Sequence, residues 1–144
     1  MFEFVVKRLG FLKSIPLAAL VFDSCIKIWV LLTTPEKLNW IDEIEEEVLT
    51  WNNVNIQLHK YGGIQFNAGK NEIGHIHSNG ILDILFSKSI KQQLLAEGKV
   101  KAHHVFKKTG WISFYLNDEQ DVEYAKSLLK KAYVNLNATT NRNE

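Results

Sequence analysis

Residues 72–86 read EIGHIHSNGILDILF, and this segment sets the expected architecture of the whole chain. Before Asn79, isoleucine is interspersed with glycine and histidine, and after Gly80 β-branched and other apolar residues dominate. Such short apolar runs on both sides of an Asn-Gly pair are typical of a β-hairpin. We therefore predict two antiparallel strands, Glu72–His77 and Ile81–Phe86.

Similar short runs bounded by turn residues lie on both sides of this hairpin and predict further strands at 54–59, 64–67, 102–106 and 111–116. Apolar residues spaced three and four apart predict three helices, which are Pro35–Trp51, Ser87–Glu97 and Asp118–Leu136. The expected fold class is α+β. It consists of an antiparallel sheet of five to six strands with helices packed mainly on one face, preceded by an apolar N-terminal helix.

The composition limits the classes of function. The chain has 144 residues, which fits one domain, and 17 Lys and Arg balance 16 Asp and Glu. Because this balance leaves no basic excess, we expect no nucleic-acid partner. The only cysteine, Cys25, excludes an intrachain disulfide and suits a reducing compartment, so we expect a cytoplasmic location.

Residues 1–34 form an apolar segment that raises the question of a membrane. Residues 11–32 are long enough to cross a bilayer, but Asp23 and Lys27 lie near the centre and offset the gain from the apolar side chains. Three alternatives stay open for this segment: a helix packed on the domain, a helix that lies at the membrane surface, or a helix that crosses the membrane. Residues 35–136 are the expected single α+β domain, and 137–144 a polar tail.

Four of the five histidines lie within thirty residues and on predicted strands. His75 and His77 are two apart, so their side chains point to the same face of a strand. His103 and His104 are adjacent and point to opposite faces, so at most one of them joins the pair. The pattern predicts a shared site that contains two or three imidazoles.

The register of the hairpin decides whether a carboxylate joins these histidines. A two-residue turn at Asn79-Gly80 places Asp83 on the face opposite to His75 and His77. A one-residue bulge at Ser78-Asn79-Gly80 reverses the faces and brings Asp83 beside them, which would create a two-His-one-carboxylate set. The sequence alone leaves both registers open.

The histidines allow three interpretations. They are semi-buried structural rings, an acid/base or binding pocket without a cofactor, or metal ligands. Because the spacing carries no dedicated metal signature, we expect no bound metal and no cofactor. Glu72 is a candidate to orient one imidazole through its ring N–H, and Trp111 is a candidate pocket wall.

The order of these residues resembles a known family. The sequence is similar to the luciferase-domain family of small bacterial proteins in three motifs. These are Glu72-Ile73-Gly74-His75-Ile76-His77, then Gly98 ahead of His103-His104, and the run Trp111-Ile112-Ser113-Phe114-Tyr115. The same order resembles the fungal luciferases, which oxidise 3-hydroxyhispidin with molecular oxygen. The resemblance covers residues 72–133. A large insertion of the fungal enzymes is reduced to residues 105–110 in this chain.

The resemblance implies a pocket for an acidic, electron-rich small molecule. It implies catalytic roles for His75, His77, His104 and His103, and binding roles for Glu72, Asp83, Trp111 and Tyr115. The leading hypothesis is an oxygen-dependent oxidoreductase acting on an enol or phenol, in which one histidine is the general base and others hold the oxyanion. The alternatives are a non-catalytic module that binds a small molecule and a structural domain without a site. The expected partners are a small-molecule ligand and, through residues 11–32, a membrane surface.

Overall fold

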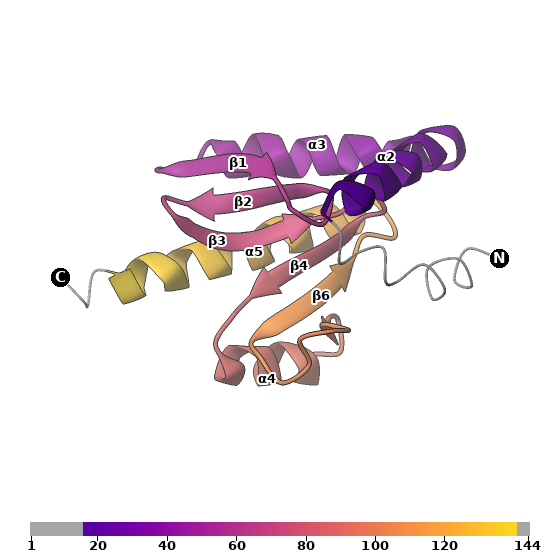
Figure 1. Ribbon diagram of the computed structural model, residues 1–144. Coiled ribbons are helices and arrows are strands. Elements are labelled where there is room, and N and C mark those ends of the chain that lie inside the picture. Colours follow the sequence, from indigo (N-terminus) through magenta and orange to yellow (C-terminus); the bar gives the residue numbers. More distant parts are fainter. Residues whose placement is uncertain (1–15, 141–144) are drawn as a thin grey trace.

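The computed structural model describes residues 16–140, which form one six-stranded antiparallel sheet and four helices (Figure 1). The elements in chain order are α2 (Pro16–Thr33), α3 (Glu36–Leu49), β1 (Val54–Leu58), β2 (Ile64–Ala68), β3 (Asn71–Ile76), β4 (Ile81–Leu85), α4 (Lys88–Ala96), β5 (Lys101–Ala102), β6 (Trp111–Tyr115) and α5 (Gln120–Thr140). The strand order is β1-β2-β3-β4-β6-β5. The predicted α+β class and antiparallel sheet are therefore confirmed.

The hydrophobic core lies between one face of the sheet and helices α3 and α5, which pack against each other along that face (Figure 1). Alternate strand residues point into this layer, so that Phe66 and Ile84 are completely buried. From α3, Ile44 and Val48 close the layer with the three- and four-residue spacing expected of an amphipathic helix. This layer makes the sheet a rigid support for its opposite face.

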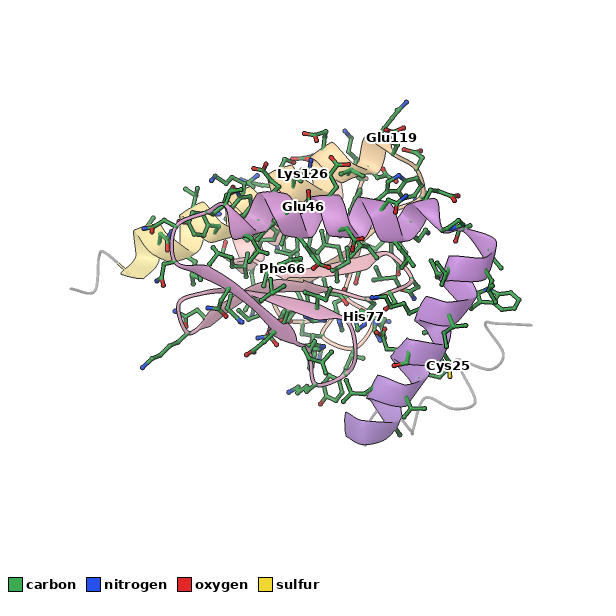
Figure 2. The ribbon with its side chains drawn as sticks, turned by 90° about the horizontal axis from the view of Figure 1, so that it is seen from above. Cys25, Glu46, Phe66, His77, Glu119 and Lys126 are labelled. Carbon is green, nitrogen blue, oxygen red and sulfur yellow. The ribbon has the colours of Figure 1, made fainter. Side chains whose placement is uncertain are left out.

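The opposite face of the sheet is polar and carries the histidines. Cross-strand pairing aligns one row through the centre of the sheet, because His75 lies beside Asp83, which lies beside Ser113. Figure 2 shows Phe66 beneath α3 and His77 on the side of the sheet that faces α2. One face thus stabilises the fold, while the other presents polar side chains.

The β3–β4 hairpin has the second of the two registers left open by the sequence. His77 and Ile81 flank a three-residue loop, since the His77 amide donates to the Ile81 carbonyl at 2.9 Å and the Gly80 amide to the His77 carbonyl at 2.8 Å. Gly80 has a φ of +83°, which is the left-handed residue that such a loop requires. The register places Asp83 on the same face as His75.

The predicted strand at 102–106 is wrong over most of its length, because β5 contains only Lys101 and Ala102. The ring Nδ1 of His103 accepts the backbone amides of Val105 and Phe106, both at 3.1 Å, and so turns the chain away from the sheet. The following loop is fixed by the buried Lys91, whose Nζ donates to two backbone carbonyls at 2.8 and 2.9 Å. His103 and His104 therefore lie in a turn rather than on opposite faces of a strand.

Helix α2 is the described part of the expected segment 1–34, and residues 1–15 lie outside the described residues. Within residues 16–140, no single helix is both long and apolar enough to cross a membrane, and the helices Ala18–Thr33 and Glu36–Leu49 reach that limit only as a pair bent by 117°. At the other end, α5 continues to Thr140, so the expected polar tail from residue 137 begins within this helix.

Candidate functional site

Three imidazole nitrogens converge on one buried carboxylate oxygen. The Oδ2 atom of Asp83 lies 3.5 Å from Nε2 of His75, 3.7 Å from Nε2 of His77 and 3.6 Å from Nε2 of His103. The other carboxylate oxygen, Oδ1, accepts a hydrogen bond from the Ser113 hydroxyl. Asp83 is 1% exposed, so its negative charge is compensated by these neighbours rather than by water.

A β-bulge brings Glu72 to the same cluster. Glu72 and His75 are three residues apart, a spacing that places side chains on opposite faces of a regular strand. The register between β2 and β3 shifts by one residue, because Asn67 pairs with Glu72 whereas Phe66 pairs with Gly74. As a result Oε1 of Glu72 lies 2.6 Å from Nδ1 of His75.

The hydrogen bonds determine which nitrogen of two rings carries a proton. Nδ1 of His103 accepts two backbone amides, so its Nε2 must be the N–H and donates toward Asp83. Nδ1 of His75 faces the Glu72 carboxylate and donates to it. Nε2 of His75 therefore carries the lone pair when the ring is neutral, whereas Nε2 of His103 does not.

Burial and neighbouring charges shift the pKa values of these groups in different directions. Burial opposes a charge on His75, but the carboxylates of Asp83 and Glu72 outweigh it and raise the pKa of this ring. Burial lowers the pKa of His77 to about 4, with a further contribution from His75. Burial also opposes ionisation of Asp83, but His75 and Ser113 outweigh this effect and lower its pKa. At neutral pH the site combines an ionised carboxylate with a neutral His77.

His59 is a member of the cluster that the sequence analysis missed. It follows β1, its ring stacks on His75 with centroids 3.8 Å apart, and it is 5% exposed. Its Nδ1 is buried without a hydrogen-bond partner. Burial, followed by the charge of His75, lowers the pKa of His59 to about 4, so this ring is also neutral at pH 7.

The cluster forms one wall of a cavity of about 540 Å³ that all five histidines of the chain line. Seven apolar and aromatic side chains contribute to the rest of the lining, together with the polar residues Asp23, Lys60 and Asn79. The apolar and aromatic residues are Phe22, Ile26, Tyr61, Ile81, Val105, Phe106 and Trp111. This volume accommodates a small organic molecule, and apolar walls with a few convergent polar groups are typical of ligand sites.

Helix α2 covers part of this cavity and is held in place by Asp23, a second residue that the sequence analysis did not assign to the site. The Oδ2 atom of Asp23 accepts the Gly63 amide at 2.9 Å and the Ser78 hydroxyl at 2.9 Å. These donors belong to the β1–β2 and β3–β4 loops. Phe22, beside Asp23, and Ile26, one turn further along the helix, thereby become parts of the lining.

The three remaining residues that were predicted for the site differ in their position relative to the cavity. His104 is exposed at the rim of the cavity, where its ring stacks on His103 with centroids 4.6 Å apart. Trp111 lines the cavity, and its ring centroid lies 5.4 Å from that of His75. Tyr115 is not among the lining residues, and its ring instead contacts the Lys101 ammonium at 4.8 Å.

The β3–β4 hairpin, four of the five histidines and β6 lie within the segment found by comparison with known families. Residues 70–132 match the model of the Luciferase domain family. This match supports a luciferase-domain family for the segment that carries His75, His77, His103 and His104. Comparison with curated proteins and with solved structures gives no match.

The matched segment does not include every part of the site. His59 and Asp23 lie outside it, so β1 and α2 add features to the cavity that the family match does not cover. The buried histidine and aspartate cluster, together with the match, is compatible with an enzyme site. Chemically, the site offers imidazoles that accept or donate protons beside a cavity lined by aromatic rings.

Proposed function

We propose that the protein is a small-molecule oxidative enzyme that uses molecular oxygen and acts on an enol or a phenol bound in the histidine-lined cavity. The observation that carries this proposal is the convergence of three Nε2 atoms on the buried carboxylate of Asp83 at the wall of a cavity of about 540 Å³. Buried groups of this kind cost folding stability, and clusters of them beside a cavity are typical of functional sites.

The first step is removal of the proton from the substrate hydroxyl. His104 is exposed at the rim of the cavity, so this ring is the candidate to accept this proton. The N–H of His103 is fixed by its turn. It lies 3.6 Å from Asp83 Oδ2, which is beyond hydrogen-bond distance, and is therefore the candidate donor to the developing negative charge.

The second step is the reaction with oxygen. The enolate donates two electrons to O₂, and a bond forms between the substrate carbon and one oxygen atom. The other oxygen atom takes the proton held by the imidazole, which gives a hydroperoxide and regenerates the neutral ring. Electrons and atoms balance with O₂ as the only oxidant.

The walls of the cavity favour a planar substrate. Trp111, Phe106 and Tyr61 supply aromatic faces or edges, which suit stacking against a conjugated ring. The imidazoles that line the cavity can accept a proton, which favours a hydroxyl group on that ring. These features support hydroxypyrones and polyphenols as the substrate class.

The direct test is oxygen uptake by the purified protein in the presence of 4-hydroxy-6-methyl-2-pyrone or catechol, measured with an oxygen electrode. The wild type should consume oxygen above the background oxidation of the compound. Asp83→Asn should lose at least about 100-fold of this rate, since Asp83 orients the imidazoles and positioned acid–base groups contribute about 10²–10⁴-fold. The matched variant Asp42→Asn, exposed on α3, should retain the wild-type rate.

Two results distinguish the alternatives. Saturable binding of the pyrone without oxygen uptake would replace the enzyme by a non-catalytic binding module. Absence of both binding and uptake for either compound would contradict the proposal and favour histidines that only stabilise the sheet.

A further inference from the structure

We propose that His75, His77 and Asp83 form a binding site for a divalent first-row transition-metal ion, with one ion per chain. The inference concerns residues that the proposed function also uses, but it is drawn from the positions and hydrogen bonds of the donor atoms alone. It replaces the expectation of a metal-free site, which was based on the spacing of the histidines in the sequence.

The donor atoms have the separations that such an ion needs. One nitrogen from each of His75 and His77 and one oxygen from Asp83 all lie within 4.8 Å of one another. Bonds of about 2.1 Å in tetrahedral or octahedral geometry place neighbouring donors about 3.0–3.4 Å apart. The observed distances from Asp83 Oδ2 to the two Nε2 atoms are 3.5 and 3.7 Å, so small side-chain movements suffice.

The hydrogen bonds around these donors also fit a metal site. A metal-bound imidazole usually donates its second N–H to a carboxylate, and Nδ1 of His75 lies 2.6 Å from Glu72 Oε1. A metal-bound carboxylate is usually held by a hydrogen bond as well, and Ser113 donates one to Oδ1 of Asp83. These contacts use Nδ1 of His75 and Oδ1 of Asp83, so Nε2 and Oδ2 are the atoms of these side chains that would bind the ion.

His103 is excluded as a third histidine ligand despite its distance of 3.6 Å from Asp83. Its Nδ1 accepts the amides of Val105 and Phe106, so the proton is on Nε2 and no lone pair points to the centre. The remaining set of two histidines and one carboxylate leaves coordination positions open toward the cavity. This set is typical of Fe(II) sites with open positions and also suits Co(II) and Zn(II).

The local charge favours a cation. Within residues 16–140, Asp83 and Glu72 form ion pairs only with histidines, and no lysine or arginine pairs with either carboxylate. A second group of donors, His59, Glu72 and His75, also has suitable separations. It is less favourable, because the short contact between Glu72 and His75 already occupies one atom of each side chain.

The test is a Co(II) titration of the full chain after dialysis against a chelator, followed by visible absorption and calorimetry. The wild type should bind one equivalent. His75→Ala, His77→Ala and Asp83→Asn should fail to bind at concentrations that saturate the wild type, whereas His104→Ala should bind normally. Glu72→Gln should bind about 10–100-fold more weakly, as found for residues that orient metal ligands.

Each contrary outcome is informative. Absence of Co(II) binding by the folded wild type overturns the inference, and so does binding that survives Asp83→Asn but is lost in His59→Ala. Because the variants can fail to fold, X-ray absorption of the Zn(II)-loaded wild type provides a second measurement. It should show two imidazole ligands, and three or more would contradict the exclusion of His103. Metal binding without oxygen uptake would reject only the proposed function.

Discussion

Asp23 is the residue whose replacement should separate helix α2 from the rest of the domain. Its carboxylate accepts hydrogen bonds from the Gly63 amide and the Ser78 hydroxyl, both at 2.9 Å, and both donors are buried. Asp23→Ala leaves these donors without a partner. Because α2 supplies Phe22 and Ile26 to the cavity, the substitution should also loosen one wall of the site.

The expected cost follows from these two contacts and from a longer one, in which the Ser78 amide donates to Oδ1 of Asp23 at 3.4 Å. A hydrogen bond to a charged group contributes about 1.5–3 kcal/mol, and partial exposure of the carboxylate reduces the total, so we expect a loss of about 2–4 kcal/mol in the free energy of unfolding. Asp42→Ala is the matched control, since Asp42 is exposed on α3, and it should change the free energy by at most about 0.5 kcal/mol.

Urea unfolding followed by circular dichroism measures the global effect, and hydrogen exchange measures the local one. The Gly63 amide should exchange faster in Asp23→Ala, because it loses its acceptor. Equal unfolding free energies for the two variants, together with unchanged exchange at Gly63, would refute the reasoning.

Further predictions concern a loop, the core and the outer face of α2. Gly63→Ala should destabilise the protein more than Gly98→Ala in urea unfolding, although both glycines have positive φ. A Cβ at Gly63 would clash with the Ile76 carbonyl oxygen, whereas nothing lies within 4 Å of a Cβ at Gly98. Equal losses of unfolding free energy would contradict this prediction. Phe66→Ala should cost about 3–5 kcal/mol of unfolding free energy, since the side chain is completely buried, and a loss below about 1 kcal/mol would contradict the core described above. Trp29 is 59% exposed in an apolar helix, so we propose that α2 contacts membranes. Trp29→Gln should then reduce sedimentation of the protein with phosphatidylcholine–phosphatidylglycerol vesicles. Unchanged sedimentation would contradict that role.

Much of the fold could be predicted from local patterns. The β3–β4 hairpin follows from the Asn79-Gly80 pair, and the helices follow from the spacing of their apolar residues, because these signals act over a few residues. The register of the hairpin could not be predicted, since Asn79-Gly80 fits both a two-residue and a three-residue loop. That one-residue difference decides whether Asp83 faces the histidines.

The parts of the site that were missed depend on contacts between distant segments. His59 reaches the cluster because β1 lies two strands away from β3 and the chain turns at Gly62 and Gly63. Asp23 contacts loops that are 40 and 55 residues away in the sequence. The position of His59 at the end of the predicted strand 54–59 was the one available indication that this ring belongs to the site. Nothing in the sequence of α2 indicates where this helix packs.

The most direct test of the histidine cluster is the long-range ¹H–¹⁵N NMR spectrum of the imidazoles, compared between the wild type and Asp83→Asn. If His75, His77 and His103 all face the Asp83 carboxylate, the Nε2 signals of all three rings should shift together in this one variant. His103 should show its proton on Nε2 in the wild type, and Asp42→Asn should shift none of the rings. Shifts confined to a single ring, or absent from all three, would show that the imidazoles do not share this carboxylate and would contradict the site.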